Sequence, residues 1–199
     1  MKKKSPTLLR MLKRQPIQIQ NSLDYSEMIF SVRSHSSEQT KTIGKAFSKI
    51  FSPGEVILLS GELGTGKTTF VGGIAVGLGI KECLSSPSFT IINLYKISNR
   101  RIFVHADFYR LDNLIQVLNT GIEDYLYKAN IYVAIEWGTK MKDYLNNNIL
   151  EIEIEYIKDQ NVFQNERNII FNDRNIIFKS SSLRWDKKLN ILKKIVDKK

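Results

Sequence analysis

The sequence predicts an α/β fold in which a sheet is flanked by helices and continues into antiparallel strands toward the C-terminus. Residues 55–60 form a short apolar run bounded by glycine, which is typical of a buried central strand. A helical pattern follows at residues 68–78, after a glycine-rich turn. Residues 150–156 alternate strictly between apolar and acidic side chains, as expected of a half-exposed strand.

One strand and one helix are expected before the central strand. Residues 28–33 alternate weakly and predict an edge strand. Residues 37–51 place Ile43, Phe47 and Ile50 at helical spacing, and the following Pro-Gly pair ends the helix.

Strands and a helix alternate after residue 78. Residues 89–97 and 101–104 predict a hairpin of two strands, and residues 131–135 predict another apolar strand. Residues 111–126 predict a helix that includes Gly121. A further hairpin is expected from residues 167–171 and 175–178. Finally, Leu189, Leu192 and Val196 lie along one side of a basic terminal helix, whose expected role is packing.

Length and composition favour one domain that does not span a membrane. The chain has 199 residues, of which 42% are hydrophobic, and it lacks the run of roughly 18 apolar residues that a membrane helix needs. The single cysteine, Cys83, cannot form an internal disulfide, so we expect a reducing, cytoplasmic compartment and a packing role for this residue. The basic N-terminus faintly resembles a transit peptide, but we favour a plain extension, and a misassigned start codon, with the true start at Met11 or Met28, would explain it equally well.

The positive charge is concentrated at the two ends. The net charge is +10, yet residues 1–20 carry six basic residues and no acid, and residues 183–199 carry seven basic residues and two acids. The remaining middle of the chain is close to neutral. Terminal basic runs are usually solvated, and contact with RNA through them is the alternative.

A glycine-rich segment joins the predicted central strand to the next helix. It reads Gly61-Glu62-Leu63-Gly64-Thr65-Gly66-Lys67-Thr68, a complete phosphate-binding loop. Its glycines let backbone N–H groups turn inward around phosphate oxygens, and the helix adds the partial positive charge of its N-terminus. We expect Lys67 to reach the β and γ phosphates and Thr68 to ligate Mg²⁺. The fold class is therefore a P-loop NTPase-like sheet, with ATP and Mg²⁺ as the expected cofactors.

Two predicted strands end in acids, as a P-loop enzyme requires. Asp107 follows the apolar residues 102–104 and shares one side of its strand with His105. Glu136 ends the next apolar strand, where a carboxylate could ligate Mg²⁺ or orient the attacking water. The catalytic candidates are Lys67, Asp107 and Glu136. Taken alone, His105 and the adjacent Trp137 are more often packing residues.

Several motifs, in order, resemble the bacterial TsaE (YjeE) ATPases, which take part in threonylcarbamoyladenosine biosynthesis on tRNA. The loop at 61–70 is similar, as is Thr40, which matches a threonine early in the first helix. The other similar segments are Ser-Pro-Ser-Phe-Thr at 86–90, His-Ala-Asp-Phe-Tyr-Arg-Leu at 105–111, Gly-Ile-Glu-Asp-Tyr at 121–125 and Glu-Trp at 136–137. The resemblance covers about residues 27–180.

This resemblance implies a set of site residues and partners. Thr68 and Glu136 would ligate Mg²⁺, Asp107 would be the Walker B acid acting through the metal's water shell, and His105 would become a site residue. The implied ATP contacts are Thr40, Glu62, Leu63, Gly64, Thr65, Gly66, Lys67, Thr68 and Trp137. The family's partners TsaD and TsaB perform threonylcarbamoyl transfer, and this chain would be the slow, partner-stimulated ATPase that resets their complex.

The sequence departs from the family pattern at three places. Glu62 stands where aspartate is usual, and Ser88 replaces a threonine, which keeps the hydroxyl but loosens the rotamer preference. The acidic pair usual before the Gly-Ile segment is missing, since residues 114–117 read Leu-Ile-Gln-Val. With these departures we expect three parts: a flexible basic extension at 1–26, a P-loop ATPase domain at 27–180, and a basic C-terminal helix at 181–199 that packs on the domain or trails from it.

Other functions remain open at this point. A P-loop small-molecule kinase needs an arginine-bearing lid and an acceptor site, which the sequence does not reveal. A GTPase would carry an Asn-Lys-x-Asp motif, which is absent, so ATP is preferred. A nucleotide-sensing RNA-binding module that uses the basic tails is the non-enzymatic alternative.

Overall fold

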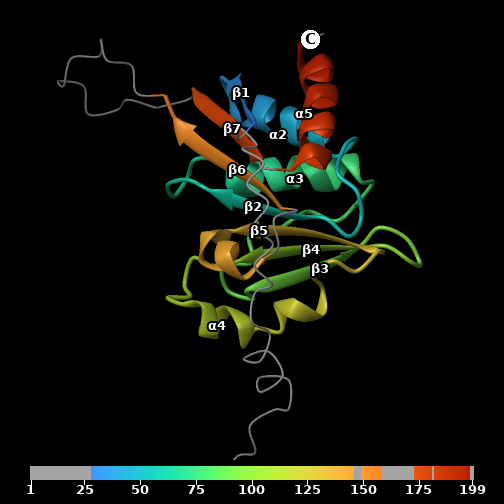
Figure 1. Ribbon diagram of the computed structural model, residues 1–199, viewed down its shortest axis with the longest axis vertical. Helices are drawn as coiled ribbons and strands as arrows, with labels where there is room; N and C mark the ends of the chain where they lie inside the picture. The colour runs from blue at the N-terminus through green and yellow to red at the C-terminus, as the bar shows by residue number, and fades with distance from the viewer. Residues whose placement is uncertain (1–27, 146–148, 158–172, 181, 198–199) are drawn as a thin grey trace, which may run out of the picture.

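The computed structural model describes residues 28–145, 149–157, 173–180 and 182–197. They build one seven-stranded sheet in the order β1-β7-β6-β2-β5-β4-β3 (Figure 1). The strands are β1 (Met28–Ser34), β2 (Val56–Ser60), β3 (Ile92–Lys96), β4 (Ile102–Asp107), β5 (Ile131–Glu136), β6 (Ile149–Tyr156) and β7 (Arg174–Ser180).

The centre of the sheet is parallel and both edges are antiparallel. β2 runs parallel to its neighbours β5 and β6, and β4 runs parallel to β5. β7 is antiparallel to β6 and β1, while β3 is antiparallel to β4. The predicted fold class is confirmed, including the antiparallel strands near the C-terminus and the edge position of the first strand.

Helices cover the two faces of the sheet unequally. The longer helices α2 (Ser37–Phe47), α3 (Lys67–Gly77) and α5 (Leu183–Val196) pack on one face. The other face is covered by short elements: α4 (Leu114–Leu118), η1 (Ile122–Asp124) and η2 (Gly138–Tyr144). Successive residues of β2 alternate between the two cores, with Ile57 and Leu59 on the α2 side and Leu58 on the α4 side. No helix in the described part of the chain is long and apolar enough to cross a membrane.

The prediction of one helix over residues 111–126 is wrong. Asn113 caps α4, which ends after five residues, and Gly121 then adopts a left-handed conformation with φ of 79°. A glycine tolerates this backbone because it has no Cβ, so the chain turns before η1 begins. The buried side chains Val117 and Ile122 thus belong to two short elements.

Three smaller expectations also need comment. The hairpin of β3 and β4 is confirmed, but its first strand begins at Ile92 because Ile91 turns with φ of 68°. Residues 175–178 lie in β7, whereas the expected partner at 167–171 is outside the described residues. The expected packing role of Cys83 is wrong, since its side chain is exposed.

Close contact between α2 and α3 fixes the helix that follows the glycine-rich loop. A Cβ on Gly44 would lie 2.2 Å from the carbonyl oxygen of Phe70, so only a glycine allows this approach. Phe47 and Phe70 pack beside that contact, with ring centroids 5.7 Å apart. The start of α3 is therefore held against the C-terminal half of α2.

A buried charge network attaches α5 to the domain. The side chain of Glu55 is fully buried and accepts hydrogen bonds from Lys188 Nζ at 2.7 and 2.9 Å. Arg184 lies 2.9 Å from the same carboxylate, and the N–H of Ser52 donates to it at 2.8 Å. Trp185, which is fully buried, packs beside this network against α2. The C-terminal helix is thus part of the folded core.

Lys188→Met should destabilise the protein by about 3 kcal/mol, because it leaves the buried carboxylate of Glu55 with one cation fewer. Lys187→Met is the matched control: that side chain is exposed, so its effect should stay within about 0.5 kcal/mol. Denaturant unfolding of the full chain measures both. Equal stability of the two variants would contradict the anchoring role of the network.

Candidate functional site

The glycine-rich loop connects β2 to α3 at the carboxyl edge of the parallel strands. Three of its glycines have positive φ: 130° at Gly61, 81° at Gly64 and 106° at Gly66. A Cβ on Gly61 would also lie 2.0 Å from the carbonyl oxygen of Ile154, so no larger residue fits there. The loop conformation depends on glycine, and it leads directly into the N-terminus of α3.

Lys67 is held inside the loop by the loop's own carbonyl groups. Its Nζ donates to the carbonyl oxygens of Gly61 at 2.8 Å and Glu62 at 2.7 Å, and it lies 4.3 Å from the ring centroid of Trp137. Burial lowers the pKa of Lys67 below its usual value, although the nearby carboxylates of Glu136 and Asp107 act in the opposite direction. The ammonium group is thus already positioned next to the place where an anion would bind.

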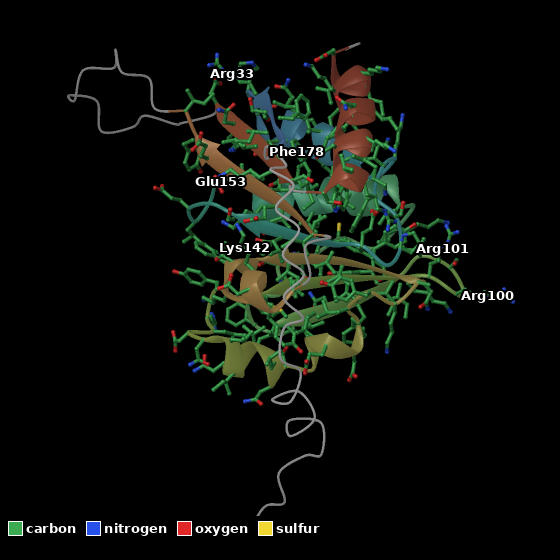
Figure 2. The ribbon with its side chains drawn as sticks, viewed as in Figure 1. Arg33, Arg100, Arg101, Lys142, Glu153 and Phe178 are labelled. Carbon is green, nitrogen blue, oxygen red and sulfur yellow. The ribbon has the colours of Figure 1, made fainter. Side chains whose placement is uncertain are left out.

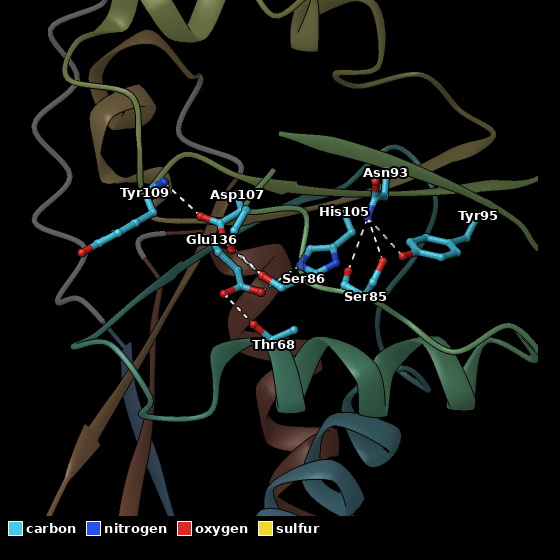
Figure 3. Close-up of polar contacts among 10 residues, drawn as sticks. Thr68, Ser85, Ser86, Asn93, Tyr95, His105, Asp107, Tyr109 and Glu136 are labelled. Atoms are coloured by element: carbon cyan, nitrogen blue, oxygen red, sulfur yellow. Dashed lines mark hydrogen bonds and ion pairs between the residues drawn. The ribbon is translucent and has the colours of Figure 1, made fainter. Parts of the chain in front are cut away.

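Glu136 connects the loop to β4. Its Oε2 accepts a hydrogen bond from Thr68 Oγ1 at 3.0 Å, and its Oε1 lies 2.8 Å from Nε2 of His105 (Figure 3). Both His105 and Glu136 are buried, while Nδ1 of His105 has no hydrogen-bond partner among the described residues. The histidine therefore orients the carboxylate toward Thr68.

Asp107 ends β4 and holds the segment that precedes β3. Its Oδ2 accepts from Ser88 Oγ at 2.9 Å, and Ser88 in turn lies 2.6 Å from Ser86 Oγ. Its Oδ1 accepts from the backbone N–H of Tyr109 at 2.9 Å (Figure 3). One buried carboxylate thus joins the end of β4 to residues 86–88.

These groups surround one pocket of about 240 Å³. It is lined by Leu63, Gly64, Gly66, Lys67, Thr68, Thr69, Ser86, Ser88, Asp107, Tyr109, Glu136 and Trp137. A positive group, a helix N-terminus and backbone N–H groups at one end suit phosphate, and carboxylate and hydroxyl oxygens at the other suit a hard cation.

The residues present also fit Mg²⁺. Two neighbouring ligands of an octahedral Mg²⁺ lie about 2.9 Å apart, and the oxygens of Thr68 and Glu136 are 3.0 Å apart. Among the described residues, no group of three His, Cys, Asp or Glu side chains could hold a metal by itself. Such an ion would therefore depend on phosphate and water oxygens as well.

The predicted site residues fall into two groups. Lys67, Thr68, Asp107, Glu136 and Trp137 line the pocket, together with loop residues 63, 64 and 66. The other predicted contacts, Thr40, Glu62 and Thr65, are not among the lining residues, and His105 lies behind Glu136.

Thr40 lies behind the loop. It is fully buried, and its hydroxyl is hydrogen-bonded to Ser34 and Ser36. Its methyl carbon faces Gly66, 3.6 Å from where a Cβ on that glycine would be. Its assignment, like that of the other ATP contacts, stays a prediction.

Two residues near the loop were not found by sequence reasoning. Tyr156, at the end of β6, donates from its hydroxyl to the carbonyl oxygen of Gly64 at 2.7 Å. Arg174, at the start of β7, lies 5.7 Å from the ring of Tyr156, and its Nε is 3.5 Å from where a Cβ on Gly66 would be. Both are separated from the loop by more than 80 residues of sequence, so no local pattern identifies them.

The chain is similar to proteins of one bacterial tRNA-modification system. A family model described as "Threonylcarbamoyl adenosine biosynthesis protein TsaE" matches residues 34–169. A Treponema pallidum protein described as tRNA threonylcarbamoyladenosine biosynthesis protein TsaE is 34% identical over 128 residues, which are 64% of this chain and 93% of that protein. A Bacillus subtilis protein of the same description is 35% identical over 127 residues, covering 64% of this chain and 78% of its own length.

The crystal structure of Bacillus subtilis YdiB has a similar fold. The two structures agree with a TM-score of 0.67 at 28% sequence identity, over 85% of this chain and 97% of YdiB. The family-model match ends before β7 and α5 begin, so Arg174 lies beyond it.

Tyr156→Phe removes one hydrogen bond that fixes the Gly64 peptide. Affinity for a triphosphate, the ligand expected for this loop, should therefore fall about three- to tenfold, and any turnover number should stay nearly unchanged. Isothermal titration and steady-state kinetics separate these two effects. Tyr125→Phe, which changes a half-buried tyrosine that does not line the pocket, is the control. A lower turnover number with unchanged affinity would show that Tyr156 does not position the loop.

Proposed function

The chain belongs to the TsaE family and has its role in tRNA threonylcarbamoyladenosine biosynthesis, and from that premise we propose that it is the Mg²⁺-dependent ATPase of the system. It binds ATP in the pocket beside the glycine-rich loop and hydrolyses it. It acts with TsaD- and TsaB-like partners, whose complex it resets after each cycle, in the cytoplasm.

One observation carries this proposal: the loop lysine, a loop hydroxyl and two strand-end carboxylates meet at a single pocket. Lys67, Thr68, Asp107 and Glu136 come from three separate segments, and all four line it. A triphosphate with Mg²⁺ requires a cation opposite its phosphates and oxygen ligands for the metal. Packing alone does not explain why a lysine is buried beside two acids, because apolar side chains would fill the same space without the cost of burying charge.

Each side chain has a defined task in hydrolysis. Lys67 moves from the carbonyls of Gly61 and Glu62 to the β and γ phosphates, which offer it full negative charge. Thr68 and Glu136 would hold Mg²⁺, which would supply neutralisation of the phosphate charge. His105 keeps Glu136 in place, and Asp107 would accept hydrogen bonds from water bound to the metal.

The same pocket gives little support to a kinase. None of the described residues that line it is an arginine, the residue expected of a kinase lid. Hydrolysis without an acceptor is useful if it changes the state of a partner. This consideration favours an ATPase that acts on other proteins.

Residues 86–90 are the segment that would report the nucleotide state. The hydroxyl of Ser88 donates a hydrogen bond to Asp107. If Asp107 gains or loses another partner in the pocket, this hydrogen bond breaks or forms, and the segment is released or held. The next residue, Ile91, has a φ of 68°. This backbone conformation is strained for a β-branched residue and destabilises the fold by of order 1–3 kcal/mol. Strain next to a segment that is bonded to the pocket through Asp107 favours a second conformation when the pocket contents change.

The exposed side chains next to this segment suit a protein partner. Phe89 is 84% exposed and Tyr109 is 50% exposed. The guanidinium of Arg110 lies 4.5 Å from the ring of Phe89. Exposed aromatic and arginine side chains are typical of protein interfaces, which supports contact with a TsaD- or TsaB-like protein here.

Glu136→Gln should lower ATP turnover by about 100-fold, because it removes a metal-ligating charge while keeping the size of the side chain. Its affinity for ATP without Mg²⁺ should stay within about threefold of wild type. Lys67→Ala should instead weaken ATP binding itself. Glu153→Gln, at a glutamate outside the pocket, is the control. Normal turnover in Glu136→Gln would show that this carboxylate does not ligate the catalytic metal.

The biological role is tested by depletion in the source organism or a culturable relative. Threonylcarbamoyladenosine in bulk tRNA should fall on depletion and recover with the wild-type gene, but not with Lys67→Ala. Purified protein alone should hydrolyse ATP slowly and faster with its TsaD- and TsaB-like partners. Normal modification throughout depletion would contradict the proposal.

A further inference from the structure

The exposed outer surface of α2 and α5 is strongly basic. The two helices lie side by side on one face of the sheet, joined by the bond from Lys188 to the carbonyl of Ile50 and by the packing of Phe47 on Trp185 (Figure 1). The exposed lysines on or directly after these helices are Lys41, Lys45, Lys49, Lys187, Lys193 and Lys194, which we name the basic helical face. The exposed acids on the same helices are only Glu38 and Asp197.

The lysines point away from the sheet, because the opposite side of each helix is buried in the core. Ile43 and Phe47 of α2, and Leu189 and Leu192 of α5, are all less than 5% exposed. Lys41 and Lys45 lie one turn apart on α2, about 6 Å along its axis, and Lys49 extends this row in the turn after the helix. An extended polyanion could contact the whole row.

These lysines are not needed for the fold. Within the described residues, none of the six is in an ion pair or a side-chain hydrogen bond. The two other cations of α5, Arg184 and Lys188, are engaged by Glu55. The structure thus separates cations that hold α5 in place from cations that only face solvent.

The opposite face of the molecule lacks this charge. Around α4, η1 and η2, acids and bases are nearly balanced. The acidic residues there are Asp112, Glu123, Asp124 and Asp143, and the basic ones are Lys128, Lys140 and Lys142. The α2–α5 side of the domain therefore carries a larger excess of positive charge than the α4 side.

We propose that the basic helical face binds the phosphate backbone of RNA, and that tRNA is the RNA it meets. Lysine ammonium groups act as point charges that bind phosphates without reading base sequence. The inference rests on the family's role in tRNA modification and not on ATP hydrolysis. None of the six lysines lines the nucleotide pocket, so RNA on this face leaves that pocket open.

The arrangement suits RNA better than a membrane surface. A helix that binds a bilayer needs its apolar side free to enter the lipid. The apolar sides of α2 and α5 are packed on the sheet, where Phe47, Trp185 and Leu189 are fully buried. Leu183 and Ile191 are the exposed large hydrophobic side chains of α2 and α5, against six exposed lysines, so charge dominates the outer surface and matches a polyanion in solution.

The test compares lysine variants of the full chain in titrations with unmodified tRNA at several salt concentrations. K41Q/K45Q/K49Q and K187Q/K193Q/K194Q should each bind tRNA at least tenfold more weakly at about 100 mM salt. Each phosphate contact that is lost lowers the slope of log affinity against log salt by about 0.7–0.9, so each variant should lose about 2 from the slope. Glutamine preserves helix propensity, and thermal unfolding should be unchanged.

The matched control removes three cations elsewhere. Arg100 and Arg101 lie at the tip of the β3–β4 hairpin, away from α2 and α5 (Figure 2), and K96Q/R100Q/R101Q should keep its affinity within about threefold. A second control, K2Q/K3Q/K4Q, measures the N-terminal segment. The proposal is overturned if both helix variants bind like wild type, or if either control loses as much affinity as they do.

Competition distinguishes RNA from other anionic partners. Polyglutamate and vesicles of anionic lipid, added at equal charge, should displace tRNA poorly, and displacement as effective as that by unlabelled tRNA would overturn the assignment to RNA. ATP turnover, measured on the same variants, should be unchanged. A failure of the ATPase proposal would therefore appear separately from a failure of this one.

Discussion

The parallel pairing of β2 with β5, and of β5 with β4, brings three strand ends to one edge of the sheet. In this register Asp107 is paired with Glu136, and Glu136 is paired with Leu59, one residue before the end of β2. The glycine-rich loop begins two residues later, so its lysine and hydroxyl come next to both acids. Because parallel strands all present their carboxyl ends at the same edge, the site follows from the order of strands.

Burial gives these groups their properties. A lysine and two acids that are each less than 7% exposed must compensate one another, since an unpaired buried charge is costly. Lys67 meets this requirement with loop carbonyls and Glu136 with Thr68 and His105. In the proposed function, phosphate oxygens would replace the loop carbonyls at Lys67 and a metal would replace the Thr68 hydrogen bond, while His105 stays on Glu136. The arrangement therefore compensates its buried charges without a ligand.

The domain separates its charges by task. Two acids and one lysine face the pocket at the edge of the sheet. The buried Glu55 network attaches α5 to the domain. The basic helical face lies on the outer side of α2 and α5. The sequence alone placed the excess charge at the two termini and left the middle close to neutral. Folding changes this picture, because α5 packs against α2 and joins its own lysines to Lys41 and Lys45 in one surface.

The sequence by itself determined the local elements and the loop chemistry. Residues 61–68 require glycine at fixed spacing, and the alternation at 150–156 marks a strand, because both patterns depend only on neighbouring residues. Gly121 ended a helix that periodicity had predicted, since a favourable glycine turn outweighs a weak apolar pattern. Only the tertiary structure decided that His105 orients Glu136 and that Tyr156 reaches Gly64, 92 residues away. Such contacts depend on strand order, which local patterns do not encode.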